Sequence, residues 1–167
     1  MAWITALLFT HNDALRLGRT LETLYACDQI LVVDQDSQDA TVRVARQYGA
    51  RVLEARPGAS PADYVRAVPS TGANSRWILC LDARESLTEK LAASLFEWKS
   101  ESLQGKARTA PAYSVFLREE TSEGWVAVPA AQTRLVPLAW NAWKGMLPAQ
   151  EGGAIVLEGE LLRFVFP

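Results

Sequence analysis

Cysteine and histidine are scarce in this sequence, which holds two cysteines and one histidine among 167 residues. Cys27 and Cys80 lie far apart and lack metal-ligand spacing. This excludes a disulfide framework and favours a reduced, cytoplasmic protein. The single His11 cannot complete a zinc site with two such distant cysteines.

A long apolar run and an excess of positive charge are also missing. No apolar run reaches the ~18 residues that a transmembrane helix needs, so we expect no membrane-spanning segment. Residues 1–10 are apolar but lack a basic region and a cleavage site, which favours a buried strand over a signal peptide. Lysine and arginine total 17 against 19 for aspartate and glutamate, which disfavours a nucleic-acid partner.

Common motifs of nucleotide and ester chemistry are absent as well. No G-x-G-x-x-G follows the first predicted strand, which disfavours a standard dinucleotide site. The sequence has no G-x-x-x-x-G-K-[ST] loop, which excludes a P-loop protein. It also has no G-x-S-x-G elbow after a strand, which disfavours an α/β hydrolase.

The length of 167 residues and the composition, with 49% hydrophobic and 22% charged residues, suit one domain. In the first half, apolar runs of strand length alternate with helical spacing. The strands predicted there cover 4–9, 30–33, 51–54 and 77–81. The helices predicted there lie around 17–24, 40–48, 62–68 and 87–95, and a capping box at 86–89 opens the last of them. Beyond a polar stretch at about 101–110, short strands are predicted at 113–118, 125–128, 134–136, 155–157 and 161–165, the last two paired around a turn at 158–160.

This alternation predicts an α/β fold. We expect a mostly parallel sheet flanked by helices on both faces, followed by a small β-rich C-terminal lobe, all within a single domain over 1–167.

In open α/β sheets, ligands bind at the carboxyl ends of the strands. The polar residues that follow the four buried runs of the first half are Thr10, His11, Asn12, Asp34, Asp36, Arg56, Asp82, Arg84 and Glu85. Several carboxylates at one edge suggest a cation, a sugar, or a ribose and base. Two acidic residues also have a structural interpretation: Asp39 as a helix cap, and Glu85 as a charge that favours a helix start.

The second predicted strand ends in the pattern V-V-D-x-x-S-x-D-x-T. Its fixed positions are Val32, Val33, Asp34, Ser37, Asp39 and Thr41. The pattern resembles that of family 2 glycosyltransferases with the GT-A fold. The segment W-I-L-C-L-D-A-R-E at 77–85 resembles the D-x-D segment of the same family, above all in the small lipopolysaccharide-core β-glucosyltransferases, where it reads L-D-A-D-E. The resemblance covers residues 2–98.

The resemblance implies an enzyme that binds a nucleotide-diphosphate sugar, often a UDP-sugar, and transfers the sugar with inversion. Residues 1–100 would form the nucleotide-binding half and 101–167 a reduced acceptor-side lobe. Thr10 and Asp34 would contact the base and ribose, with His11 and Asp36 as helpers, and Asp82 would lie beside the ribose and diphosphate. The nucleotide-binding candidates are therefore Thr10, His11, Asp34, Asp36, Arg56, Asp82 and Arg84. A divalent Mg²⁺ or Mn²⁺ normally offsets the diphosphate charge in such enzymes, and an acidic base activates the acceptor hydroxyl.

Several positions depart from the family pattern. Arg84 replaces the second aspartate of D-x-D, which leaves Asp82 as the one candidate metal ligand, because a guanidinium cannot bind a metal. Arg84 could offset the diphosphate charge itself and allow metal-independent binding, or pair with Asp82 or Glu85 and leave the site inactive. The family's Arg-Asn pair before the fourth strand is not recognisable. The residues 146–148 stand where the similar enzymes carry His-Glu, and the nearest carboxylate, Glu151, is the candidate base.

Two other functions remain open. A non-catalytic GT-A relative would keep the fold and act as a nucleotide-binding or protein-interaction module. A nucleotidyltransferase-like domain is disfavoured, because the first loop is not rich in glycine. For the enzyme, the resemblance implies a sugar or lipid-linked acceptor and a position in the cytoplasm, including the periphery of the inner membrane face. A homo-oligomer is compatible with it.

Overall fold

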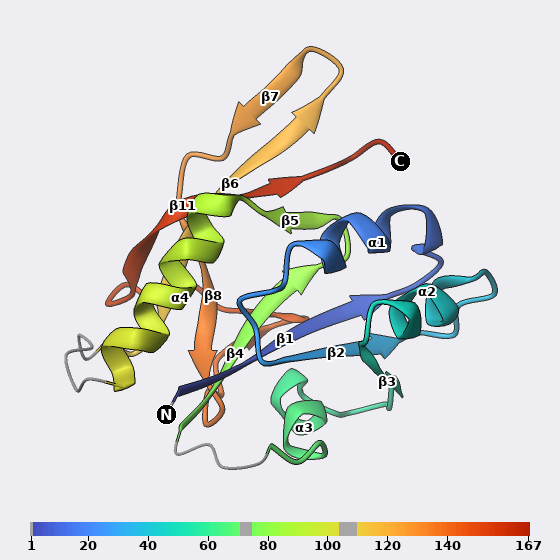
Figure 1. Ribbon diagram of the computed structural model, residues 1–167, viewed down its shortest axis with the longest axis horizontal. Helices are drawn as coiled ribbons and strands as arrows, with labels where there is room; N and C mark the ends of the chain where they lie inside the picture. The colour runs from blue at the N-terminus through green and yellow to red at the C-terminus, as the bar shows by residue number, and fades with distance from the viewer. Residues whose placement is uncertain (1, 71–74, 104–109) are drawn as a thin grey trace.

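The computed structural model describes residues 2–70, 75–103 and 110–167, which form a mixed α/β fold (Figure 1). Within these residues, one large sheet has the order β3-β2-β1-β4-β8-β6-β11-β5, and β7 pairs with β6. The first four strands of this order are parallel: β3 (Arg51–Glu54), β2 (Gln29–Asp34), β1 (Ala2–Thr10) and β4 (Ser75–Asp82). The α/β fold expected from the alternating pattern is confirmed.

The strands of the second half extend the same sheet. β8 (Gln132–Pro137) pairs antiparallel with β4 and so connects the two halves. The other strands of this half are β5 (Glu85–Leu87), β6 (Tyr113–Thr121), β7 (Gly124–Ala127) and β11 (Ile155–Arg163). A separate two-stranded sheet consists of β9 (Trp143–Lys144) and β10 (Leu147–Pro148).

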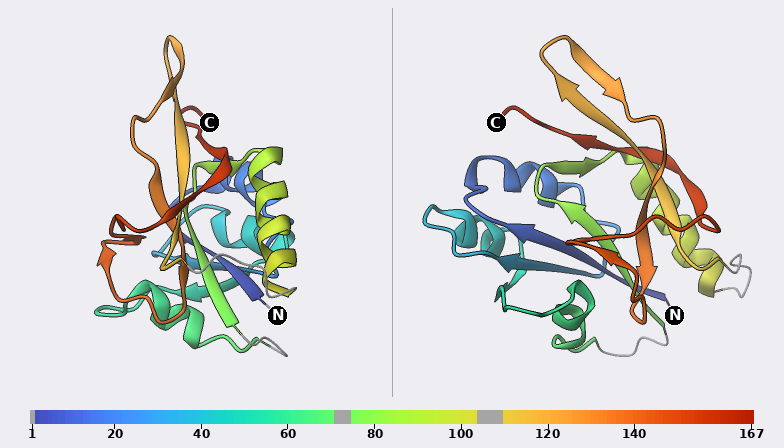
Figure 2. Two further views of the ribbon diagram at one scale, coloured as in Figure 1. Left: turned by 90° about the vertical axis from the view of Figure 1, so that its left-hand side faces the viewer. Right: turned by 180° about the vertical axis from the view of Figure 1, so that it is seen from behind.

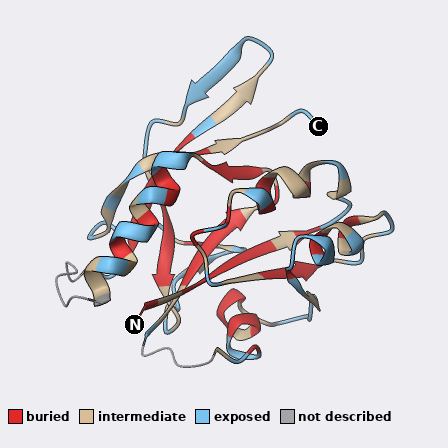
Figure 3. Ribbon diagram, viewed as in Figure 1, coloured by how far each residue is buried: buried red, intermediate tan, exposed pale blue. Residues whose placement is uncertain are grey.

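Helices cover both faces of the sheet and enclose two hydrophobic cores (Figure 2). The helices α1 (Ala14–Glu22), α2 (Thr41–Gln47) and α4 (Glu89–Leu103) pack on one face. The helix α3 (Pro61–Arg66) and the β9–β10 hairpin pack on the other. Successive residues of β1 point to opposite faces, so Leu8 lies in the first core and Leu7 in the second. Figure 3 shows that burial is concentrated in these central strands, whereas β7 is exposed.

The residues after β4 form a short strand, so the predicted helix start at Ser86 is wrong. Residues 85–87 form β5, which pairs antiparallel with β11, and α4 begins at Glu89. The Leu91 amide donates to the Thr88 hydroxyl at 3.3 Å, so Thr88 caps the helix in place of Ser86.

A buried ion cluster holds β5 in the sheet. The carboxylate of Glu85 is fully buried and accepts hydrogen bonds from Arg134 Nη1 at 2.6 Å and Nη2 at 2.9 Å. It also accepts from Arg163 Nη2 at 3.0 Å and from the backbone N–H of Asp82 at 2.7 Å. Arg134 lies in β8 and Arg163 in β11, so this carboxylate of β5 connects both strands to the end of β4. The interpretation of Glu85 as a charge at a helix start is therefore wrong.

The prediction of two strands paired around 158–160 is also wrong, because these residues belong to one continuous strand, β11. Its register shifts between Val156 and Glu160, and Gly159 has a φ of 97°. A Cβ built on Gly159 would lie 2.3 Å from the backbone nitrogen of Leu91 in α4. Only glycine lets the strand and the helix approach this closely.

We expect Gly159→Ala to destabilise the protein by at least about 2 kcal/mol, because it adds backbone strain and a clash with α4. Urea denaturation measures the change. Gly152→Ala is the matched control, because nothing lies within 4 Å of a Cβ built there. Equal stability of the two variants would contradict the close approach of β11 and α4.

We expect Glu85→Ala to cost about 3–5 kcal/mol of stability, because it leaves a buried guanidinium without its counter-charge. Arg134 is only 1% exposed, so water cannot take over that role. The exposed Glu89, at the start of α4, provides the control, and its alanine variant should lose less than about 1 kcal/mol. A loss of similar size in both variants would show that the Glu85 cluster does not hold the sheet together.

Candidate functional site

The carboxyl ends of neighbouring parallel strands bring the predicted site residues to one edge of the sheet. Thr10 at the end of β1 is in register with Asp34 of β2, and Phe9 is in register with Asp82 of β4. Paired strands lie about 4.8 Å apart, so the backbones of Asp34 and Asp82 are about 10 Å apart across β1. Arg84 lies in the turn that follows Asp82.

Asp34 is held in place by three hydrogen bonds from two neighbouring residues. Its Oδ1 accepts from the Thr10 hydroxyl at 2.8 Å and from the Ser37 hydroxyl at 2.6 Å, and its Oδ2 accepts from the Ser37 amide at 2.9 Å. Burial alone would raise the pKa of Asp34, but these hydrogen bonds outweigh it and lower the pKa. The side chain is therefore a fixed negative charge at neutral pH.

The loops after β1 and β2 are bonded to each other. Asn12 and Asp36 both adopt left-handed backbone conformations, with φ of 52° and 55°. The Asn12 amide donates to the Ser37 hydroxyl at 2.9 Å, and Nδ1 of the exposed His11 lies 2.6 Å from the carbonyl oxygen of Gln35. These bonds hold the tips of the two loops in one arrangement.

Asp39 caps helix starts, which is the structural role that the sequence left open. Its carboxylate accepts from the Thr41 hydroxyl, from the Thr41 amide at 2.9 Å and from the Ala14 amide at 3.3 Å. The bond from the Thr41 hydroxyl, which is the largest effect, lowers the pKa of Asp39. One side chain thus satisfies amides at the start of both α1 and α2.

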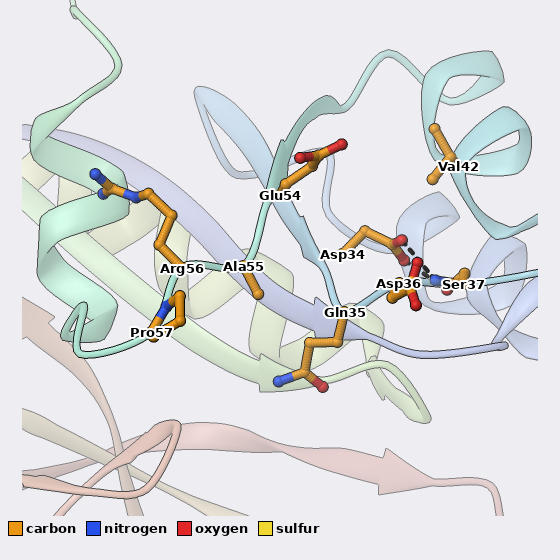
Figure 4. A pocket seen from close by; sticks show the side chains of 9 residues that line it. All are labelled: Asp34, Gln35, Asp36, Ser37, Val42, Glu54, Ala55, Arg56 and Pro57. Atoms are coloured by element: carbon orange, nitrogen blue, oxygen red, sulfur yellow. Dashed lines mark hydrogen bonds between the residues drawn. The ribbon is translucent and has the colours of Figure 1, made fainter.

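A groove of about 720 Å³ opens beside Asp34 (Figure 4). It is lined by Asp34, Gln35, Asp36, Ser37, Val42, Glu54, Ala55, Arg56 and Pro57. Glu54 is in register with Asp34, so the groove runs between the ends of β2 and β3. Sequence reasoning missed Glu54 and Gln35, although the strand-end rule covers both positions.

Arg56 lines this groove but extends toward α3, away from Asp34 (Figure 4). Its guanidinium lies over the Tyr64 ring, 5.2 Å from the ring centroid. The Tyr64 hydroxyl in turn accepts from the Arg56 amide at 2.7 Å. Arg56 therefore supplies a cation at the wall of the groove nearest α3.

The β9–β10 hairpin brings the C-terminal part of the chain to the same edge. Gln35 Nε2 donates to the sulfur of Met146, in the turn between β9 and β10, at a distance of 3.6 Å. Trp143 and Leu147 anchor the hairpin on the second core. The segment in which the similar enzymes carry His-Glu thus lies beside the loop after β2.

Asp82 and Arg84 form an ion pair at the end of β4. Arg84 Nε donates to Asp82 Oδ1 at 2.9 Å, Nη2 donates to Oδ2 at 3.3 Å, and the Arg84 amide also donates to Oδ1 at 2.9 Å. Burial would raise the pKa of Asp82, but these bonds outweigh it and lower the pKa. The hydrogen bond to Asp82 raises the pKa of Arg84, so both groups are charged at neutral pH.

In this arrangement the one candidate metal ligand, Asp82, is already paired. The Arg84 guanidinium covers both oxygens of Asp82, the candidate ligand. Among the residues that the structure describes, no group of three His, Cys, Asp or Glu side chains could hold a metal ion. Mg²⁺ is commonly held by one or two carboxylates together with the phosphates of a substrate, so a cation here would have to displace Arg84 from Asp82.

Glu151, the candidate base, lies in the loop after β10. Its amide donates to the Thr133 hydroxyl at 3.0 Å, and its Oε1 accepts from the Gly153 amide at 3.0 Å. The register of β8 against β4 places Thr133 near the carboxyl end of β4. The backbone of Glu151 thus lies near the carboxyl edge of the sheet, where the other candidate residues lie. Its carboxylate is hydrogen-bonded within its own turn.

Comparison with known proteins finds similarity to glycosyltransferases. No protein-family model matches the sequence. Over 92 residues, 54% of this chain, it is 35% identical to an uncharacterized glycosyltransferase of Rickettsia felis, and it covers 32% of that protein. A second uncharacterized glycosyltransferase, from Rickettsia bellii, is 34% identical over 91 residues, which are 53% of this chain and 30% of that protein. The chain thus spans about a third of the length of these relatives.

Among solved structures, S. aureus TarS superimposes on 82% of this chain and 28% of its own, with a TM-score of 0.51 and 12% sequence identity. A likeness at this identity concerns the fold alone. No helix in the described part of the chain is long and apolar enough to cross a membrane. The curled α/β sheet is a GT-A-like fold, and the sequence similarity relates the chain to glycosyltransferases.

Proposed function

We propose that this chain binds a nucleotide-diphosphate sugar, a UDP-sugar in the simplest case, and transfers the sugar to an acceptor hydroxyl with inversion. We assign it to the family 2 type, in the subtype of the small lipopolysaccharide-core β-glucosyltransferases. The similarity to proteins named glycosyltransferases and the GT-A-like fold support sugar transfer. The V-V-D-x-x-S-x-D-x-T pattern that ends at Thr41 supports the family.

The observation that carries this proposal is the charged, fixed carboxylate of Asp34 at the mouth of the groove. A carboxylate offers about four acceptor positions, and the bonds from Thr10 and Ser37 occupy three of them. The remaining position suits one donor, such as a ribose hydroxyl or an N–H of the base. Because Asp34 is already charged and oriented, the ligand does not pay for ordering it.

The other residues of the edge fit the same ligand. Asp36 and Arg56 line the groove, where they would contact the base or ribose, and Thr10 acts by holding Asp34. His11 directly follows β1, and its ring contacts the loop after β2. Asp82 would lie beside the ribose and the diphosphate.

The reaction is a single displacement at the anomeric carbon. The acceptor oxygen forms a bond to that carbon, and the bond from the carbon to the diphosphate oxygen breaks. The electron pair of that bond leaves on the nucleoside diphosphate, and the hydroxyl proton passes to a carboxylate base. Attack opposite the leaving group inverts the carbon. We assign the base to Glu151, which would have to release the Gly153 amide.

The acceptor side would be formed by residues 101–167, with the β9–β10 hairpin beside the donor groove. We propose a sugar or a lipid-linked sugar as the acceptor. A lipid-linked acceptor would place the protein at the cytoplasmic face of the inner membrane. A homo-oligomer is compatible with this arrangement.

A second candidate is a non-catalytic relative that binds a nucleotide or a protein partner without transferring sugar. The bond that holds the Glu151 carboxylate in its own turn favours it, because a base must be free to reach the acceptor. This candidate predicts nucleotide binding without turnover.

We expect Asp34→Ala to weaken the binding of UDP by the free energy of one charged hydrogen bond. This is about 1.5–3 kcal/mol, or about 10- to 150-fold in Kd. Calorimetric titration of the purified chain measures this change. Glu123→Ala, at an exposed turn between β6 and β7, is the matched control and should bind as the unmodified protein does. If Asp34→Ala also binds as tightly, the nucleotide site is placed wrongly.

Release of UDP from UDP-sugars, with and without sugar acceptors, separates the two candidates. Turnover that Glu151→Gln abolishes while UDP binding persists supports the enzyme. Tight UDP binding without turnover across donors and acceptors supports the binding module.

A further inference from the structure

The pair formed by Asp82 and Arg84 is exposed on one side. The two side chains are 33% and 36% exposed, so the pair faces solvent at the carboxyl edge of the sheet. Two N–H groups of the guanidinium bond to Asp82, out of the five that an arginine carries. The remaining donors are those that planar, two-point recognition of a phosphate requires.

The charged groups around this pair are matched in number. Glu85 is paired with Arg134 and Arg163, and Arg163 also pairs with Glu119 at 3.0 Å. With Asp82 paired to Arg84, the three carboxylates of this neighbourhood match its three guanidiniums. A divalent cation at this turn would first have to displace Arg84 from Asp82. An incoming diphosphate, in contrast, meets no net repulsion.

The position of Arg84 relative to the groove fits a nucleoside diphosphate. Asp34 and Asp82 end neighbouring strands on either side of β1, about 10 Å apart. A nucleoside beside Asp34 whose diphosphate runs across the end of β1 would bring that diphosphate to the turn at Arg84. The turn itself is rigid, because Glu85 accepts from the Asp82 amide and Phe164 donates its amide to the Arg84 carbonyl at 2.9 Å.

We propose that the Arg84 guanidinium binds the diphosphate of the nucleotide directly, in place of a divalent cation, so that nucleotide binding is independent of metal. This inference rests on the proposed nucleotide-sugar function. Asp82 orients the guanidinium and leaves its outer edge free for the phosphates. The pair is partly exposed, so a phosphate can reach the outer edge of the guanidinium.

Calorimetric titration with UDP and with uridine, in EDTA and in Mn²⁺, tests the proposal. We expect UDP to bind in EDTA with the same Kd as in Mn²⁺. Arg84→Ala should weaken UDP binding at least about tenfold and leave uridine binding unchanged, because only the charged contact is lost. Arg84→Lys should lie between the two, since it keeps the charge and loses the planar fork.

The matched control is Arg51→Ala, because Arg51 is an exposed arginine at the start of β3, at the opposite end of that strand from the groove. It should bind UDP as the unmodified protein does, and thermal melting confirms that each variant is folded. UDP binding that requires Mn²⁺, or that persists undiminished in Arg84→Ala, would overturn the inference and leave the nucleotide-binding function standing. Absence of both uridine and UDP binding in the unmodified protein would overturn the function and the inference together.

Discussion

One buried carboxylate connects the two halves of this sheet. Glu85 accepts from Arg134 in β8, from Arg163 in β11 and from the Asp82 amide at the end of β4. A buried charge is costly unless it is fully paired, and here Glu85 has hydrogen-bond donors on both oxygens. The turn that carries Asp82 and Arg84 is thereby fixed to the C-terminal strands.

The pairing of charged groups also explains the candidate site. At the end of β2, Asp34 is charged and accepts three hydrogen bonds, from Thr10 and Ser37, which leaves it one position for a ligand. At the end of β4, Arg84 neutralises Asp82, so the edge combines a fixed anion on one side of β1 with a neutral ion pair on the other. That asymmetry suits a ligand with a hydrogen-bonding nucleoside at one end and a diphosphate at the other.

Local pattern was enough to predict the parallel half of the sheet and the edge at which its polar residues meet. Apolar runs such as that of β2 reveal buried strands, and parallel strands place their carboxyl ends together. The same reasoning misjudged Glu85, because its partners lie 49 and 78 residues away and no local pattern reveals them. The signal in the sequence was one arginine in each of two short segments predicted as strands, 134–136 and 161–165. The turn-like composition around Gly159 likewise concealed a continuous strand, whose bulge is set by contact with α4. Whether Arg84 would pair with Asp82 or with Glu85 depended on geometry that the sequence left open.

The measurement that tests the central claim most directly is a map of amide chemical shifts upon titration with UDP, which a protein of 18.4 kDa permits. A nucleotide across the ends of β1, β2 and β4 should shift the amides of Gln35, Ala55 and Arg84, and leave that of Gly124 at the β6–β7 turn unchanged. Shifts confined to other parts of the molecule, or no shifts at all, would contradict a nucleotide site at this edge of the sheet.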